Sequence, residues 1–263
     1  MPSYVVTGAS RGLGYGFIKV LSQQPNNLVI GLVRNKEATD AKIAADNLKN
    51  IHIIQADITD LASLEGAKAQ IEKLTPSIDY LINNAAFLPG NTAFKKLTDF
   101  TDNPKVLEDD LRLSVETNVL GVIWTTNTFL PLVRKSSIKK VITISSGMAD
   151  ISFVNDYEIF EGGPYTISKA AVNTVVAKYN AALKHEGILF LAISPGFVNT
   201  GADSMPPPDS ELPKKFMRAY PHFKGGISPE ESVEAVMGVV DKASVDNEFA
   251  GAFVSHLGNQ QWL

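Results

Sequence analysis

Tyr165 and Lys169 have the residue types and the spacing that proton transfer requires. Side chains four positions apart share one face of a helix, so the phenol and the ammonium can lie close together. A phenol ordinarily ionises at about pH 10 and is a poor acid at neutral pH. A nearby cation favours the phenolate and brings the phenol toward useful acidity. A surface lysine beside a packed tyrosine is the alternative, because such pairs also arise by chance.

Two further polar positions fit the same chemistry. Ser145 and Ser146 end a predicted strand at 139–145, and ligands of open parallel sheets bind outside the carboxyl ends of the strands. A seryl hydroxyl there can donate a hydrogen bond to a substrate carbonyl oxygen while the phenol protonates it. Asn118 places an amide inside a predicted helix, where an apolar residue would pack better; a solvent-facing position is the alternative.

A glycine-rich turn lies near the start of the chain, in the run Thr7-Gly8-Ala9-Ser10-Arg11-Gly12-Leu13-Gly14. Glycines there permit positive φ and let backbone N–H groups approach a pyrophosphate at the N-terminus of the following helix. Three residues separate the first two glycines, where the usual dinucleotide fingerprint has one. A glycine-rich turn without a ligand is therefore the alternative.

Two arginines indicate which dinucleotide would bind. Arg34 follows the second predicted strand, where a carboxylate normally receives the ribose hydroxyls and an arginine accommodates a 2′-phosphate. Arg11 supplies a second guanidinium, and together they favour NADP over NAD. Each arginine alone would be an ordinary surface charge. Asp57 follows the third predicted strand and is placed either to contact the adenine or to enter the next helix.

Short apolar runs alternate with helical patterns along the whole chain. We expect strands at 3–7, 28–33, 51–56, 79–83, 139–145, 188–194 and 252–255. We expect helices at 14–24, 37–48, 61–74, 106–133, 165–184 and 229–242. This alternation predicts βαβ units and a parallel sheet with helices on both faces. The continuous Val, Ile and Leu content of the strands indicates burial on both sides of the sheet.

The stretch 199–226 does not continue the alternation of strands and helices, and it contains three consecutive prolines and several glycines. We interpret it as a substrate-side lid on a single domain spanning 1–263, because only one helix and one strand follow it. An aromatic group here comprises Phe216, Tyr220 and Phe223, with Met205 and Met217 nearby. It either lines an apolar pocket or packs a short helix on the body of the protein.

Composition excludes several classes of function. The 263 residues contain 24 basic and 28 acidic side chains, a net charge of −4, so no basic surplus is available for nucleic acid. There are no cysteines, which removes disulfides and thiolate metal sites and suits a reducing compartment. No apolar run is long enough to span a membrane, and no leader segment is recognisable. The four histidines are scattered. We expect a cytoplasmic protein without a metal, a membrane or nucleic acid as partner.

In order and spacing, these residues closely resemble the classical short-chain dehydrogenase/reductase family over nearly the full length. The matching features are Thr7-Gly8-x-x-x-Gly12-x-Gly14, Asp57, Asn83-Asn84-Ala85, Asn118, Ser146, Tyr165-x-x-x-Lys169 and Ser194-Pro195-Gly196 with Thr200. Within the family the chain is most similar to sniffer and C-factor carbonyl reductases and to fungal norsolorinic acid ketoreductases. The features behind that narrower resemblance are Arg34-Asn35, Gly162-Gly163 and the tail from Gly251-Ala252-Phe253 to Trp262.

The resemblance implies an α/β fold with a Rossmann-like, doubly wound, mainly parallel seven-stranded sheet. It implies a catalytic tetrad of Asn118, Ser146, Tyr165 and Lys169. In such a tetrad the tyrosine is the general acid and the serine polarises the substrate carbonyl. The lysine holds the nicotinamide ribose and lowers the tyrosine pKa, and the asparagine supports a proton relay through water. The residues expected to contact NADP(H) are Gly8, Ser10, Arg11, Gly12, Leu13, Gly14, Arg34, Asp57, Ile58, Asn84, Ala85, Tyr165, Lys169, Pro195, Gly196, Val198 and Thr200.

The function that we expect is NADP(H)-dependent reduction of a ketone or aldehyde, in a homodimer or homotetramer, and the narrower resemblance implies a secondary metabolite as the substrate. The alternative is a non-catalytic NADP(H)-binding regulator or scaffold. Two departures from the family pattern concern the site. Ala86 replaces the usual glycine, which questions the turn geometry there, and the stretch from Ser146 to Tyr165 is longer than in the simplest members.

Overall fold

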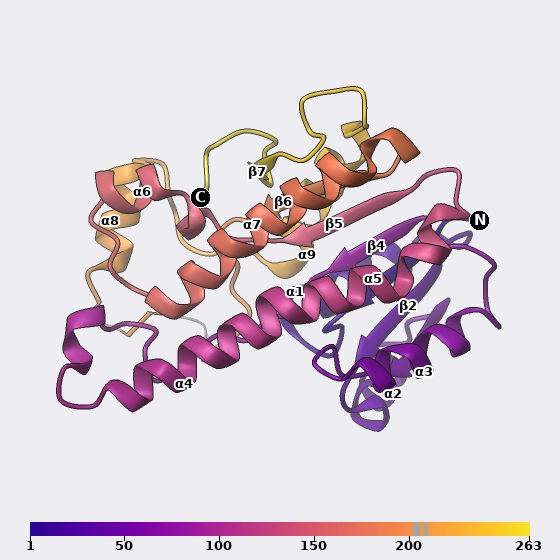
Figure 1. The fold of residues 1–263 in the computed structure, drawn as a ribbon, viewed down its shortest axis with the longest axis horizontal. Coiled ribbons are helices and arrows are strands. Elements are labelled where there is room, and N and C mark those ends of the chain that lie inside the picture. The colour runs from indigo at the N-terminus through magenta and orange to yellow at the C-terminus, as the bar shows by residue number, and fades with distance from the viewer. Residues whose placement is uncertain (202–205, 208–209) are drawn as a thin grey trace.

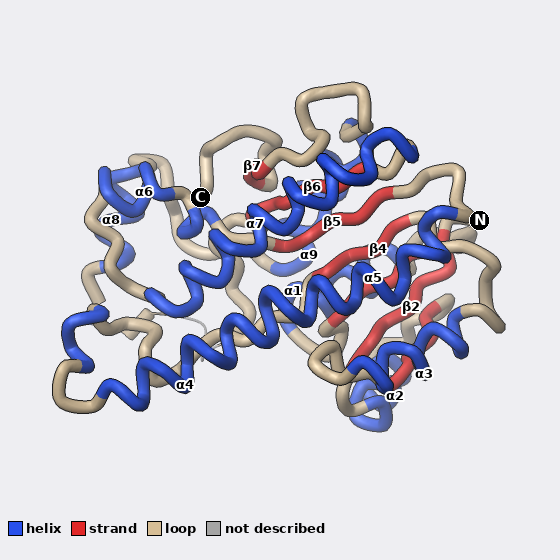
Figure 2. Tube along the Cα trace, viewed as in Figure 1, coloured by secondary structure: helices blue, strands red, loops and turns tan. Residues whose placement is uncertain are grey.

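A computed structural model describes residues 1–201, 206–207 and 210–263. Its centre is a seven-stranded parallel sheet in the order β3-β2-β1-β4-β5-β6-β7 (Figures 1 and 2). The strands are β1 Ser3–Thr7, β2 Leu28–Val33, β3 Ile51–Gln55, β4 Tyr80–Asn83, β5 Lys140–Ile144, β6 Leu189–Ser194 and β7 Phe253–Ser255. All seven expected strands are present, and their ends differ from the expectation by at most one residue.

The main helices alternate with these strands. They are α1 Gly12–Leu21, α2 Lys36–Ala45, α3 Leu61–Ile71, α4 Pro104–Val115, α5 Gly121–Arg134, α7 Gly163–Leu183 and α9 Pro229–Lys242. This arrangement confirms the doubly wound Rossmann-like fold. The long helix expected at 106–133 is interrupted, because η2 (Glu116–Leu120) is a turn of π-helix between α4 and α5.

Short helices surround the carboxyl ends of the strands, and the sequence pattern indicated only the one near Phe216, as an alternative. These are η1 Leu97–Phe100, η3 Gly147–Ala149, α6 Ile151–Asp156 and α8 Leu212–Ala219, with η4 Lys184–Glu186 at the opposite end of α7. The helix α8 lies inside the stretch 199–226 that we interpreted as a lid. Residues 202–205 and 208–209 of that stretch, Met205 among them, lie outside the described residues.

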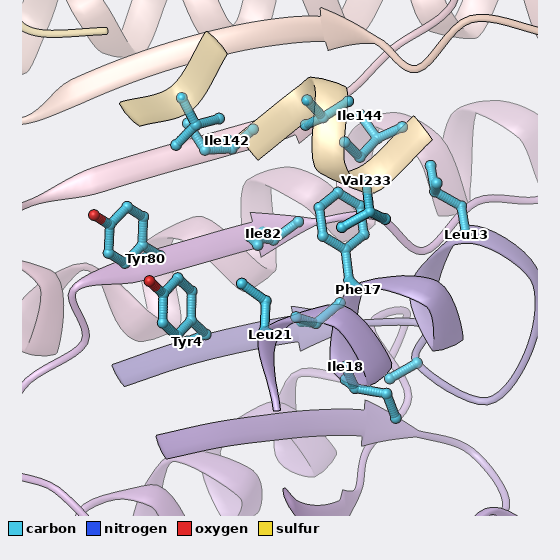
Figure 3. Close-up of a cluster of buried hydrophobic side chains, with 14 of the residues drawn as sticks. Tyr4, Leu13, Phe17, Ile18, Leu21, Tyr80, Ile82, Ile142, Ile144 and Val233 are labelled. Carbon is cyan, nitrogen blue, oxygen red and sulfur yellow. The ribbon is translucent and has the colours of Figure 1, made fainter. Parts of the chain in front are cut away.

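Alternate strand residues face opposite layers of helices. Tyr4 and Val6 of β1 belong to the core cluster that contains α1 and α9, whereas Val5 belongs to the cluster that contains α3, α5 and α7. Figure 3 shows the first cluster, where Phe17 of α1 lies beside Val233 of α9 above the strands. Burial of both faces explains the continuous apolar composition of the strands.

The lobe built from α6 and α8 lies beyond the ends of the strands, at the left of Figure 1. The amino ends of α4 and α7 reach the same side, so these elements surround the place where a parallel sheet binds its ligands. Within the described part of the chain, no helix combines the length and the apolar character needed to cross a bilayer.

Candidate active site

The structure brings Ser146 and Tyr165 together. Ser146 follows β5 as the N-cap of η3, where its Oγ accepts a hydrogen bond from the backbone N of Met148 at 3.3 Å. Tyr165 is in the first turn of α7, close enough to Ser146 for hydrogen bonding between the two side chains to lower the pKa of the phenol. Both side chains line the same pocket. A carbonyl oxygen placed there would meet two hydroxyl groups.

Lys169 lies one helical turn after Tyr165 and is only 3% exposed. Its Nζ donates a hydrogen bond to the carbonyl oxygen of Ile144 at 2.7 Å, which ties α7 to the end of β5. The same Nζ lies 5.6 Å from the centroid of the Tyr165 ring. The two side chains therefore share one face of the helix, as their spacing predicts.

The acidity of Tyr165 differs from the expectation, and burial also shifts the pKa of Lys169. Burial raises the pKa of Tyr165 to about 12, and its hydrogen bond with Ser146 opposes this only in part. Burial also lowers the pKa of Lys169 to about 8. Loss of hydration disfavours both charged forms, and this outweighs the attraction between phenolate and ammonium. The side chains by themselves thus keep the phenol protonated and able to donate.

Asn118 is fully buried in the π-helical turn, so the solvent-facing alternative is wrong. Its Oδ1 accepts a hydrogen bond from the backbone N of Phe87 at 2.7 Å, and its Nδ2 donates to the oxygen of Phe87 at 3.0 Å and to Ser168 Oγ at 2.9 Å. Ser168 in turn donates to the oxygen of Tyr165 at 2.7 Å. Asn118 thereby joins the loop after β4 to the helix that contains Tyr165. The sequence reasoning did not single out Ser168.

The glycine turn packs closely against the end of β4. Thr7 Oγ1 accepts hydrogen bonds from the backbone N–H groups of Asn84 and Ala85, both at 3.0 Å. A Cβ on Gly8 would lie 2.8 Å from the Cα of Ala85, and a Cβ on Gly14 would lie 2.2 Å from the oxygen of Gly8. Only glycine fits at these two positions. Ala86 does not have a left-handed backbone, so replacement of the usual glycine causes no strain there.

The start of α1 has the features of an anion site. Its N-cap residue, Arg11, makes no side-chain cap hydrogen bond, and no acidic residue lies in the first turn. Ser10, Arg11 and Arg34 are exposed, and neither arginine forms an ion pair with any residue that the structure describes. The backbone N of Gly8 bonds to Leu32 O at 2.9 Å, so the end of β2 lies beside this turn. These groups fit the phosphates of a dinucleotide.

The remaining residues expected to contact the cofactor differ in which groups they leave available. Leu13 and Ile58 are 9% and 7% exposed and pack into the core, so only their backbone groups remain for a ligand. Asp57 Oδ1 accepts hydrogen bonds from Thr59 N at 2.9 Å and Thr59 Oγ1 at 2.7 Å, and Asp60 is the N-cap of α3. The carboxylate of Asp57 therefore stabilises the turn that leads into α3.

The segment after β6 lies across from the glycine turn. The oxygen of Pro195 accepts a hydrogen bond from Ser232 Oγ at 2.6 Å, and Val198 forms a parallel bridge with Ile227. A Cβ on Gly12 would lie 3.2 Å from the Cβ of Thr200. Gly196 has φ +82° and leaves room for the ring of His256.

His256 is buried, and burial lowers its pKa. No group of three or more His, Cys, Asp or Glu side chains suited to a metal ion occurs among the described residues.

The pocket in front of Ser146 and Tyr165 is mainly aromatic and apolar. Its side-chain walls include Phe94, Phe153, Phe197, Phe216 and Trp262. Of the aromatic group expected here, Phe216 lines this pocket, and Tyr220 and Phe223 pack behind it.

Trp262 closes one side of the pocket. Its Nε1 donates to Asp150 Oδ2 at 2.8 Å, and its ring stacks on Phe253 at 4.5 Å between centroids. A Cβ on Gly147 would lie 2.3 Å from the Cβ of Trp262. The sequence reasoning identified Trp262 only as part of the tail and did not identify Phe94 or Phe153, because no local spacing connects these positions.

Comparisons with known proteins agree with this geometry. A family model described as short chain dehydrogenase matches residues 3–209. The short-chain dehydrogenase/reductase AacuF of Aspergillus aculeatus is 48% identical over 269 residues, covering 100% of both chains. The short chain dehydrogenase virK of Hypocrea virens is 43% identical over 271 residues, again covering 100% of both chains.

Solved structures of carbonyl reductases share the fold. The NADPH-bound carbonyl reductase from chicken fatty liver has a TM-score of 0.79 at 26% identity, covering 98% of this chain and 93% of that chain. The carbonyl reductase Sniffer of D. melanogaster also has a TM-score of 0.79, at 22% identity over 98% of each chain, a likeness that concerns the fold alone. Sequence, fold and matched residues lead to one conclusion: the chain belongs to the short-chain dehydrogenase/reductase family of oxidoreductases.

Proposed function

We propose that this protein is an NADP(H)-dependent reductase of ketones or aldehydes. One observation carries the proposal: Ser146 and Tyr165 line the same aromatic pocket, with the buried Lys169 one helical turn after Tyr165. A protonated phenol beside a second hydroxyl suits a carbonyl oxygen that becomes an alcohol oxygen. The NADPH-bound carbonyl reductase from chicken fatty liver, which has the same fold, supports this interpretation.

The glycine turn, the exposed Arg11 and Arg34, and the segment 195–200 would hold the dinucleotide. When bound, the reduced nicotinamide supplies a hydride to the carbonyl carbon. Two exposed guanidinium groups near the start of α1 and the end of β2 support NADP(H) over NAD(H), because rigid forks suit a phosphate better than a diol.

Each catalytic side chain then has a separate task. Ser146 donates a hydrogen bond to the carbonyl oxygen and orients it, and Tyr165 transfers its phenolic proton to the same oxygen. Lys169, a cation below about pH 8, holds the nicotinamide ribose and stabilises the phenolate that this transfer leaves. Asn118 keeps Phe87 and Ser168 in place and supports the return of a proton through water. Hydride plus proton convert the carbonyl into the alcohol.

The rest of the proposal concerns the protein as a whole. We propose one oxidoreductase domain over 1–263 with a substrate-side lid at about 199–226, in a cytoplasmic homodimer or homotetramer. The aromatic pocket supports a flat or extended apolar substrate, and the fungal relatives support a secondary metabolite.

NADPH consumption tests the proposal. The purified protein is assayed against small quinones, aromatic aldehydes and polycyclic ketones. Tyr165→Phe should lower kcat at least about 100-fold, because the proton donor is lost, while NADPH still binds. Tyr157→Phe removes a phenol that lies near the pocket but does not line it, and should keep wild-type turnover.

Full activity of the Tyr165→Phe variant would overturn the mechanism. NADPH binding without turnover of any carbonyl or alcohol would favour the non-catalytic regulator instead.

A further inference from the structure

The pocket contains one charged side chain among the described residues that line it. Glu161 is 4% exposed and precedes Tyr165 by four residues, directly before the turn that begins α7. Burying a carboxylate costs free energy unless it is paired and hydrogen-bonded. A fully apolar wall would serve an apolar substrate without this cost. Glu161 therefore requires an explanation that packing does not supply.

Lys215 of α8 is the partner of this carboxylate. Its Nζ donates to Glu161 Oε1 at 2.9 Å, to Glu161 Oε2 at 3.0 Å and to the oxygen of Glu158 at 2.8 Å. These three bonds use all the protons of an ammonium. The Nζ also lies 3.7 Å from the centroid of the Phe160 ring. Lys215 is thus fully engaged and holds the carboxylate in one place.

The carboxylate of Glu161 uses only about half of its capacity to accept hydrogen bonds. A carboxylate has about four acceptor positions, and Lys215 occupies two of them. No other donor to Glu161 occurs among the described residues. An acceptor that lines a pocket and keeps free lone pairs is ready to receive a hydrogen bond from whatever enters that pocket.

We propose that Glu161 determines substrate specificity by accepting a hydrogen bond from a hydroxyl group on an aromatic carbonyl compound. The inference rests on the proposed reductase function and identifies its substrate class. The aromatic side chains contact the ring system, Ser146 and Tyr165 receive the carbonyl oxygen, and Glu161 receives the hydroxyl. Lys215 acts as a positioning residue for Glu161.

The charge balance favours a neutral donor over an ion. Lys215 already neutralises Glu161, so a cationic substrate would gain little net attraction, and it would lose its hydration on entering. A substrate carboxylate would face the glutamate and be repelled. A phenol or alcohol avoids both penalties. The competing explanation is that the pair only anchors α8 to the loop before α7.

Matched substrates separate these explanations. We choose 2-acetylnaphthalene and a set of its monohydroxylated isomers, because the isomers place the donor at different distances from the carbonyl. For the best isomer we expect kcat/KM to exceed that of the parent ketone by about 10- to 100-fold, as hydrogen bonds to charged groups allow. The amino and carboxyl analogues should show no such advantage.

Two double variants remove the charge without leaving a buried ion unpaired. Glu161→Leu with Lys215→Met replaces the pair by apolar groups, a change that buried ion pairs often tolerate. It should abolish the preference for the hydroxylated ketone through KM, with little change in kcat for the parent. Glu161→Gln with Lys215→Met keeps an amide oxygen as acceptor and should restore part of the preference. Arg218→Gln, which breaks an exposed ion pair of α8 with Glu158, is the surface control.

Each outcome has one meaning. Equal kcat/KM for all isomers and the parent would overturn the inference and leave the reductase proposal standing. An equal loss with every substrate in the Leu/Met variant would show that the pair only anchors α8, which also overturns it. Failure of the protein to reduce any carbonyl compound would instead refute the proposed function on which the inference rests.

Discussion

The proposed cofactor side, at the glycine turn, and the proposed substrate side, at the aromatic pocket, are built in opposite ways. On the cofactor side, consecutive residues of one turn pack backbone against backbone, and a Cβ at Gly8 or Gly14 would collide with neighbouring main chain. On the substrate side, the pocket wall combines segments that are distant in the sequence, from Phe94 to Trp262, through side chains that stack and hydrogen-bond.

This difference has a physical origin. A turn that must bring backbone N–H groups to an anion leaves no space for substitution, because its groups are main chain and cannot move aside. A pocket wall of side chains can be rebuilt from other side chains of similar volume. We therefore expect the cofactor side to tolerate very little change and the substrate side to change its specificity readily.

Gly14→Ala is the largest expected effect. Its Cβ would lie 2.2 Å from Gly8 O and 2.5 Å from Asn84 Nδ2, so the turn must distort. We expect the free energy of unfolding to fall by about 3 kcal/mol, the upper part of the range for overpacking, and NADPH binding to be lost. Urea unfolding and cofactor titration measure the two effects.

Two matched variants sharpen this comparison. Gly66→Ala adds a Cβ to α3 where no atom lies within 4 Å, and should stabilise the protein by about 0.5–1 kcal/mol. Phe153→Leu on the pocket wall should cost less than about 1.5 kcal/mol and alter the relative KM of substrates while NADPH binding persists. If Gly14→Ala behaves like Gly66→Ala, the close packing described for the turn is wrong.

Replacement of Lys169 should have an intermediate effect on the free energy of unfolding, and this effect depends on pH. Burial lowers its pKa from 10.5 to about 8, so between these values the unfolded chain binds a proton that the folded chain does not. The free energy of unfolding therefore rises with pH in this window, by about 2 kcal/mol between pH 8 and 9.5. Below pH 8 both states are protonated, and the burial penalty applies in full. Tyr165, with its pKa raised to about 12, stays protonated throughout.

Comparison with Lys169→Met isolates this contribution, because every other titrating group remains. Urea unfolding at pH 7.5, 8.5 and 9.5 should show the difference in unfolding free energy between wild type and variant growing with pH in favour of the wild type. If the unfolding free energies of the two proteins changed with pH in parallel, the lowered pKa of a buried Lys169 would be contradicted.

The substitution Arg34→Gln should have the smallest effect, a weaker preference for NADPH over NADH. The side chain is exposed, so removing it should leave the fold intact and remove one charge-assisted hydrogen bond to a phosphate. We expect kcat/KM for NADPH to fall about tenfold while the value for NADH changes less than twofold. Arg218→Gln, an exposed arginine of α8, should leave the ratio of NADPH to NADH unchanged. An unchanged ratio in Arg34→Gln would refute the proposed contact with the phosphate.

The sequence predicted the strands well because each is a short apolar run bounded by polar turns, and burial on both faces requires that composition. It did not predict the π-helical turn at Asn118, because the helical spacing of apolar and polar residues continues through this turn. The helix α8 was foreseen only as an alternative, a short helix near Phe216, because it is short and follows a proline-containing stretch with a composition typical of loops.

Local spacing indicated Tyr165, Lys169 and Ser146 as candidates, since a helix places the first two on one face and a strand end presents the serine, whereas the tetrad that adds Asn118 rests on the family resemblance. The ionisation of these groups could not be predicted, because it depends on how much water the folded protein removes. Burial raised the pKa of Tyr165, against the expectation, and lowered that of Lys169, for which the sequence led to no expectation. The pocket wall depends on contacts between segments far apart in the chain, such as Gly147 against Trp262 and Glu161 against Lys215. Local periodicity gives strands, helices and the glycine turn, whereas desolvation and long-range packing exist only once the chain has folded.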